Sequence, residues 1–190
     1  SETRFGANIT RSIGQNMVAY AEWAGGERRN LISEALRFGR ETDTIPEGAP
    51  DTLPSDGGKR FRNEAAVGFS YTTESKITFN LEYHFNEAGF SRHDWHNWFD
   101  GGGDRSRSAA LWFIRSYAVD QQAPISRHSV FLRADWTDAM VPDLDLTGFV
   151  NIDLYDGSGL AQATADYHLS DFWTVGGLAT ATFGTKDSDF

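Results

Sequence analysis

The sequence predicts an all-β protein: an antiparallel up-and-down transmembrane β-barrel with about eight visible strands and helical segments in its long loops. Apolar and polar residues alternate over segments of roughly ten residues, the pattern of a strand with one apolar and one wet face. Tight turns join several of these segments, so the neighbouring strands are antiparallel. Large aromatic residues on the apolar faces lie near strand ends, whereas a soluble core places its bulkiest residues in the middle.

The clearest alternation lies in residues 76–85, where apolar residues at odd positions interleave with polar residues at even ones. Residues 144–155 repeat the pattern, with two charged residues on the wet face. The same criterion predicts eight strands, at 4–12, 16–24, 62–72, 76–85, 127–136, 144–155, 159–168 and 173–183. Each is close to the roughly 9–11 residues that a tilted strand needs to cross a bilayer.

Two kinds of connection join these strands. Short turns are expected at 12–15, 72–75, 156–158 and 169–172, which carry Gly, Asp and Ser. Two long loops are expected at 25–61 and 86–126. The first contains Leu31, Ile32, Ala35 and Leu36 at helical spacing, which predicts a helix over 28–39 that ends at Gly39.

The segment 109–119 in the second long loop is predicted to be a helix. Its residues Leu111 to Ile114 show no alternation. A ninth strand here would also place a long loop or a tight turn on the wrong side of a barrel. We expect Leu111, Trp112, Phe113 and Ile114 to be buried against the other long loop, through Leu31, Ile32, Leu36 and Phe38. The two loops would then form a cap over the barrel mouth.

Composition narrows the function classes. The 190 residues carry a formal net charge of −10, which argues against a nucleic-acid binder because phosphates require a basic face. The chain has no cysteine, so disulfides and cysteine-based zinc sites are excluded. The longest apolar run, 109–114, is far shorter than the roughly 18 residues of a membrane-spanning helix.

We expect residues 1–190 to form a single β-barrel domain or a fragment of one. The chain begins at Ser1 without an initiator methionine, so we expect any targeting peptide to have been removed or to lie upstream of the residues shown. With turns on the inner side, both chain ends would emerge on the outer side, so we expect at least one strand to be missing at each end. A closed eight-stranded barrel made of this chain alone is the alternative architecture.

Each face of the predicted strands has its own expected neighbour. The aromatic residues of the apolar faces should lie on the outer wall in two belts at the membrane interfaces; they are Trp23, Tyr83, Trp136, Tyr167, Trp173 and Phe183. The charged residues of the opposite faces should line the lumen, where the surplus of acids favours cations; they are Lys76, Glu82, Arg133, Asp135, Asp145, Asp153 and Asp166. A charged face would suit the outside of a soluble barrel equally well, so only the aromatic placement separates the two classes.

A repeated unit of strand, aromatic residue, polar turn and strand occurs at 69–78 and again at 166–175. In this unit the sequence resembles bacterial outer-membrane β-barrels of the porin type, over about half of the chain. The resemblance implies periplasmic turns, location in the bacterial outer membrane and a passive channel for small polar solutes. It also implies the lipid bilayer and lipopolysaccharide as partners, together with a homo-oligomer or other outer-membrane subunits, and no nucleic acid. Two alternatives stay open: a closed barrel acting as a membrane anchor or assembly partner, and a soluble ligand-binding β-barrel.

Catalytic and metal-binding patterns are weak. His93, Asp94 and His96, with Asp100 nearby, have no further ligand at a fixed spacing, so we expect a polar helix with surface histidines rather than a metal site. Ser129 follows His128 directly and points to the opposite face, and Ser126 lies about 7 Å from His128 along a strand. We therefore expect no enzymatic activity, no cofactor and no metal.

Overall fold

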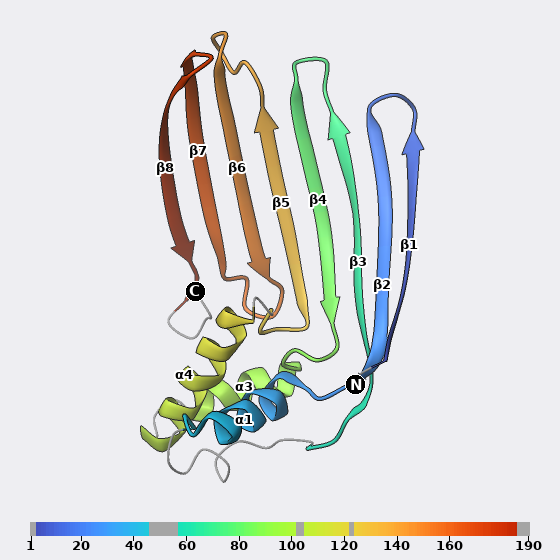
Figure 1. The fold of residues 1–190 in the computed structure, drawn as a ribbon, viewed down its shortest axis with the longest axis vertical. Coiled ribbons are helices and arrows are strands. Elements are labelled where there is room, and N and C mark those ends of the chain that lie inside the picture. The colour runs from blue at the N-terminus through green and yellow to red at the C-terminus, as the bar shows by residue number, and fades with distance from the viewer. Residues whose placement is uncertain (1–2, 46–56, 102–104, 122–123, 186–190) are drawn as a thin grey trace. The chain divides into compact units, whose positions relative to one another are not determined.

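The computed structural model describes residues 3–45, 57–101, 105–121 and 124–185. Eight antiparallel strands form one sheet in the order β1 to β8, so each strand pairs with its neighbours in sequence (Figure 1). The strands are β1 (Arg4–Ile13), β2 (Met17–Arg28), β3 (Arg60–Thr72), β4 (Ile77–Asn86), β5 (His128–Trp136), β6 (Leu144–Asp153), β7 (Gly159–Ser170) and β8 (Trp173–Phe183). The predicted strands and their up-and-down order are confirmed.

The sheet is not closed over the residues described, and β1 and β8 are its edge strands. Every residue of these two strands is exposed. Because the strands alternate in direction, β1 and β8 are antiparallel to each other. Closure into a barrel and insertion into a membrane remain predictions.

Among the described residues of the two long connections, three segments are helical: α1 (Leu31–Thr42), α3 (Arg92–Gly101) and α4 (Arg105–Asp120). The helices predicted over 28–39 and 109–119 are thus confirmed, and the segment 109–119 is not a ninth strand. No helix in the described part of the chain is long and apolar enough to cross a membrane.

Contacts between residues divide the chain into two compact units. The first, here called the helical unit, contains residues 1–7, 23–65 and 85–127, and therefore the three helices. The second, here called the strand unit, contains residues 8–22, 66–84 and 128–190, and therefore β5 to β8 in full.

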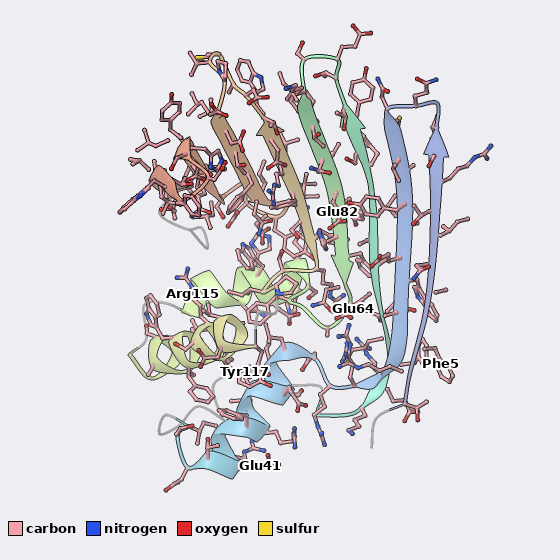
Figure 2. All side chains as sticks on the ribbon, turned by 45° about the horizontal axis from the view of Figure 1, so that its top comes forward. Phe5, Glu41, Glu64, Glu82, Arg115 and Tyr117 are labelled. Atoms are coloured by element: carbon pink, nitrogen blue, oxygen red, sulfur yellow. The ribbon has the colours of Figure 1, made fainter. Side chains whose placement is uncertain are left out.

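The core of the helical unit forms where α1 meets α4. Leu31, Ile32, Ala35 and Leu36 of α1 are buried, as are Ala110, Leu111, Ile114 and Ala118 of α4. The rings of Phe38 and Tyr117 lie 5.3 Å apart between centroids, and Figure 2 labels Tyr117. The predicted burial is confirmed for Leu111 and Ile114 of one long loop and for Leu31, Ile32 and Leu36 of the other.

Two expectations from the sequence are wrong: the burial of Trp112 and the end of the first helix at Gly39. Trp112 is 64% exposed because it lies on the outer side of α4, where the Arg115 guanidinium stands 5.4 Å from its ring centroid. Gly39 does not end α1, which continues to Thr42. A Cβ atom at Gly39 would lie 2.6 Å from Phe113 Cζ, so this glycine allows α4 to approach α1 closely.

Local side chains define where the helices begin. The Asn30 side chain accepts a hydrogen bond from the Ser33 amide at 2.8 Å, which caps α1. Before α3, the Ser91 hydroxyl accepts from the Asp94 amide at 3.2 Å, and Asp94 accepts in return from the Ser91 amide at 2.8 Å. This reciprocal pair is a capping box.

Candidate lumen face and membrane face

The apolar face of the strand unit is built from alternate residues of β5 to β8. In the register, Leu132 stands opposite Val150, and Ala163 stands between Gly148 and Ala179. Small residues in mid-strand leave a shallow hollow of about 430 Å³ whose apolar lining includes Ala134, Ala161, Ala163, Ala179 and Ala181. The small and aliphatic residues in the middle of β5 to β8 therefore lie together on one continuous surface.

Aromatic residues flank this surface at both strand ends. Trp136, Tyr167 and Trp173 lie near the turns that join β5 to β6 and β7 to β8, whereas Phe183 stands opposite Gly159 at the other end of β8. Tyr167, Trp173 and Phe183 are exposed, and Trp136 is half-buried. None of the four is packed in a closed interior.

The two remaining aromatic residues of the predicted belts make polar contacts. Tyr83 is exposed, and its hydroxyl lies 2.6 Å from His128 Nδ1. In the helical unit, Trp23 Nε1 donates to Asn63 Oδ1 at 3.1 Å, and its ring stacks on Phe61 with centroids 6.4 Å apart. Amphipathic rings with a polar handle suit a boundary between water and hydrocarbon.

The strands contribute nothing to the buried apolar core over the residues described. The buried apolar side chains among the described residues belong to the helices, to their flanking segments or to one turn: Leu31, Ile32, Ala35, Leu36, Ala88, Phe90, Trp95, Ala110, Leu111, Ile114, Ala118 and Ala139. On the strands, large apolar residues such as Phe5, Ile9, Val67, Leu132 and Val175 are exposed; Figure 2 shows Phe5 on the edge strand β1. Over the described residues, the large apolar side chains of the strands therefore lie outside the buried core.

The opposite face of β5 to β8 carries the predicted lumen residues. The Arg133 guanidinium donates three hydrogen bonds to Asp135, between 2.7 and 3.0 Å. Asp135 also accepts from the Thr147 hydroxyl at 2.9 Å. Asp145 stands directly opposite Asp166, and His168 Nε2 lies 3.3 Å from Asp145 Oδ2. These side chains share one polar surface.

Other predicted lumen residues belong to different local environments. Asp153 ends β6, is buried, and accepts a hydrogen bond from the Tyr155 amide at 2.6 Å. Glu82 lies in mid-strand on β4 (Figure 2), forms an ion pair with His84 and hydrogen-bonds with Tyr20.

The position of Lys76 differs from the one predicted from the sequence. The strand β4 begins one residue later, and Lys76 lies in the preceding turn with a φ of 62°. Its ammonium group forms an ion pair with Asp138 in the turn between β5 and β6. The pKa of the Asp138 carboxyl is lowered by a hydrogen bond from Lys76, by a hydrogen bond from the Asp143 amide and by the positive charge of Lys76. Lys76 is thus a link between two turns rather than a residue of a strand interior.

A polar network that the sequence interpretation missed lies in the helical unit. Arg28 pairs with Glu64 and donates to Asn86 Oδ1 at 2.9 Å. Arg62 is fully buried, and its guanidinium donates to the backbone carbonyls of Arg28 at 3.2 Å and Glu87 at 3.4 Å. No sequence motif marks this network. The only sequence signal for it is the polar residues at the ends of β2, β3 and β4.

Glu87 completes this network. Its carboxylate accepts from the Asn63 amide at 3.0 Å and from the Asn63 side chain at 2.9 Å. Burial alone raises the pKa of Glu87, but these hydrogen bonds and the charges of Arg60 and Arg62 outweigh burial and lower the pKa. The Glu87 carboxylate therefore connects the first part of β3 to the segment that follows β4.

Two of the residues considered as metal ligands, Asp94 and His93, have structural partners. Asp94 belongs to the capping box described above, and His93 Nε2 lies 3.1 Å from Asn97 Nδ2. The Asp100 side chain lies outside the described residues. Within the described ranges no three histidine, aspartate or glutamate side chains are grouped as a metal site.

Comparisons with protein-family models, with curated proteins and with solved structures found no match for this chain.

Proposed function

We propose that this chain forms wall strands of a bacterial outer-membrane β-barrel, a porin-like passive channel for small polar solutes that favours cations. One observation carries the proposal: the apolar residues of the strands are exposed, while every buried apolar residue among those described lies outside the strands. A water-soluble antiparallel sheet packs at least one face on a core. A sheet whose apolar face lacks protein cover is suited to lipid.

The arrangement of residue types along the strands supports the same conclusion. On β5 to β8, aromatic residues flank a middle of alanine, glycine and aliphatic residues. Interfaces between water and lipid attract tryptophan and tyrosine, whereas the hydrocarbon region accepts small and aliphatic side chains. In this proposal the edge strands β1 and β8 pair with further strands of the barrel or with each other, because an uncovered edge is unstable in lipid.

The polar face supports the cation preference. Asp135, Asp145 and Asp166 share this face with Arg133. The Arg133 charge is already paired with Asp135, so Asp145 and Asp166 leave the face with negative charge. Carboxylates along a narrow aqueous path raise the local concentration of cations.

Two experiments test the proposal. The purified protein should require detergent or lipid to stay monodisperse; a monodisperse protein in plain buffer would contradict membrane insertion. In planar bilayers, reversal potentials across a KCl gradient should show cation preference, and Asp145→Asn with Asp166→Asn should reduce it. Asp171→Asn, in the turn after β7, is the matched control and should change it little. Anion preference would contradict the assigned lumen face, and absence of conductance would favour a closed barrel that acts as an anchor.

A further inference from the structure

Two phenyl rings stand on the polar face of the strand unit. Phe131 of β5 and Phe149 of β6 have ring centroids 5.6 Å apart with an interplanar angle of 35°. The register places Phe131 opposite Asn151 and Phe149 opposite Arg133, so both rings lie on the face of Asp135 and Thr147 rather than on the apolar face. Both residues are only half-buried. Rings on a wet face gain little from burial, so their presence there needs another explanation.

The groups around the rings are polar and largely fixed. Arg133, beside Phe149, is held by three hydrogen bonds to Asp135, which neutralises its charge locally. On the other side of Phe149, Gln162 of β7 donates to the Thr180 hydroxyl at 3.3 Å. The ring pair therefore sits in a hydrogen-bonded frame without an unpaired positive charge among these neighbours.

Carboxylates outnumber arginine and lysine side chains on the polar face of β5 to β8. On the polar face of the strand unit, the carboxylates of Asp145 and Asp166 lie further along β6 and β7 from Phe149, and Glu82 lies on β4. The face of an aromatic ring carries partial negative charge and attracts cations, and aromatic sites commonly recognise quaternary ammonium groups. Apolar ring surface together with negative potential selects a cation that has apolar substituents.

We infer that Phe131 and Phe149 form a binding platform for small organic cations of the alkylammonium class. The inference rests on the proposed function, because it assumes that the polar face borders a solute path. It adds a solute class to that function: an inorganic cation, which is strongly hydrated, gains less from a phenyl ring than an alkylated ammonium group does. A neutral sugar could stack on the same rings but would not benefit from the negative potential.

Equilibrium titrations of the purified protein in detergent micelles test this inference, with binding followed by ligand-observed NMR. The probes are choline, its neutral carbon analogue 3,3-dimethylbutan-1-ol, and glucose. Choline should bind more tightly than either neutral probe. Phe131→Leu and Phe149→Leu keep an apolar side chain but remove the ring, and each should weaken choline binding about two- to five-fold, the factor expected for one cation–π contact at an exposed site. Phe79→Leu, an exposed apolar residue of β4, is the matched control and should leave binding unchanged.

Three outcomes would overturn the inference: equal binding of choline and its neutral analogue, preferential binding of glucose, or unchanged choline binding in both leucine variants. If Phe149→Leu does not fold, Phe149→Trp replaces it and should strengthen choline binding, because the indole face attracts cations more strongly than the phenyl face. Binding in micelles requires no conductance. If the unchanged protein conducts cations but does not bind choline, the binding platform is rejected and the channel stands. If it binds choline but shows no conductance, the channel is rejected and the platform stands.

Discussion

Gly68 of β3 leaves the space in which the Tyr20 side chain of β2 lies. A Cβ atom at Gly68 would lie 2.7 Å from the Tyr20 hydroxyl oxygen and 2.6 Å from the backbone carbonyl oxygen of Leu81. The tyrosine could move, but the carbonyl belongs to β4, the strand paired with β3. A side chain at position 68 is therefore excluded by backbone as well as by Tyr20.

Gly68→Ala should destabilise the strand unit by about 1–3 kcal/mol, the range for overpacking in a well-packed region. Equilibrium unfolding in urea, in the presence of lipid, measures the change. Gly177→Ala on β8 is the control, because a Cβ there would meet no atom within 4 Å. Equal stability of the two variants would show that the space at Gly68 is not restricted.

The contact between α1 and α4 predicts a contrast between two neighbouring residues. Ile114 is fully buried, so Ile114→Ala should cost about 2–5 kcal/mol and expose α1 amides to hydrogen exchange. Trp112→Ala removes an exposed ring and one contact with Arg115, which should cost about 0.5–1 kcal/mol. A larger loss for Trp112→Ala than for Ile114→Ala would contradict the observed orientation of α4.

The cap of α1 can be tested separately. Asn30→Ala removes the acceptor for the Ser33 amide and should cost about 1 kcal/mol. Asn30→Asp keeps an acceptor and adds a favourable negative charge at the helix N-terminus, so its stability should be close to that of the unchanged protein. Hydrogen exchange of the first-turn amides of α1 measures both effects, and equal exchange in the alanine variant would argue against the cap.

The lowered pKa of Glu87 gives a pH dependence with a defined sign. Because the pKa is lower in the folded state than in the unfolded chain, the unfolded state binds more protons as the solution becomes acidic. The stabilisation is therefore present above the ordinary carboxyl pKa and is lost as the pH falls through the lowered value. Hydrogen exchange at the Asn63 amide, which donates to Glu87, should accelerate over this interval relative to other slow amides.

Glu87→Gln is the control for that prediction. The variant has no carboxyl group to titrate at position 87, so the relative exchange of the Asn63 amide should no longer depend on pH in the acidic range. A dependence that persists in the glutamine variant would assign the effect to another group.

The pattern of residues along the chain is enough to predict the strands and the helices of the two long connections. Alternation at residues such as 77–85 fixes which side chains share a face, because successive side chains of a strand point to opposite sides. Helical spacing of Leu31, Ile32, Ala35 and Leu36 likewise identified the buried face of α1. The aromatic positions near strand ends were also readable, since they depend on position along a strand and not on distant partners.

Features that depend on residues far apart in sequence become visible only in the folded chain. Gly39 looked like a helix stop, but its role is to admit Phe113 of α4. Trp112 and Ile114 are both apolar, and only the packing against α1 determines which of them is buried. Lys76 was assigned to a strand, whereas its pairing with Asp138 joins two turns. The buried network around Arg62 and Glu87 likewise arises only when the ends of β2, β3 and β4 meet, because each hydrogen bond joins segments that local sequence cannot bring together.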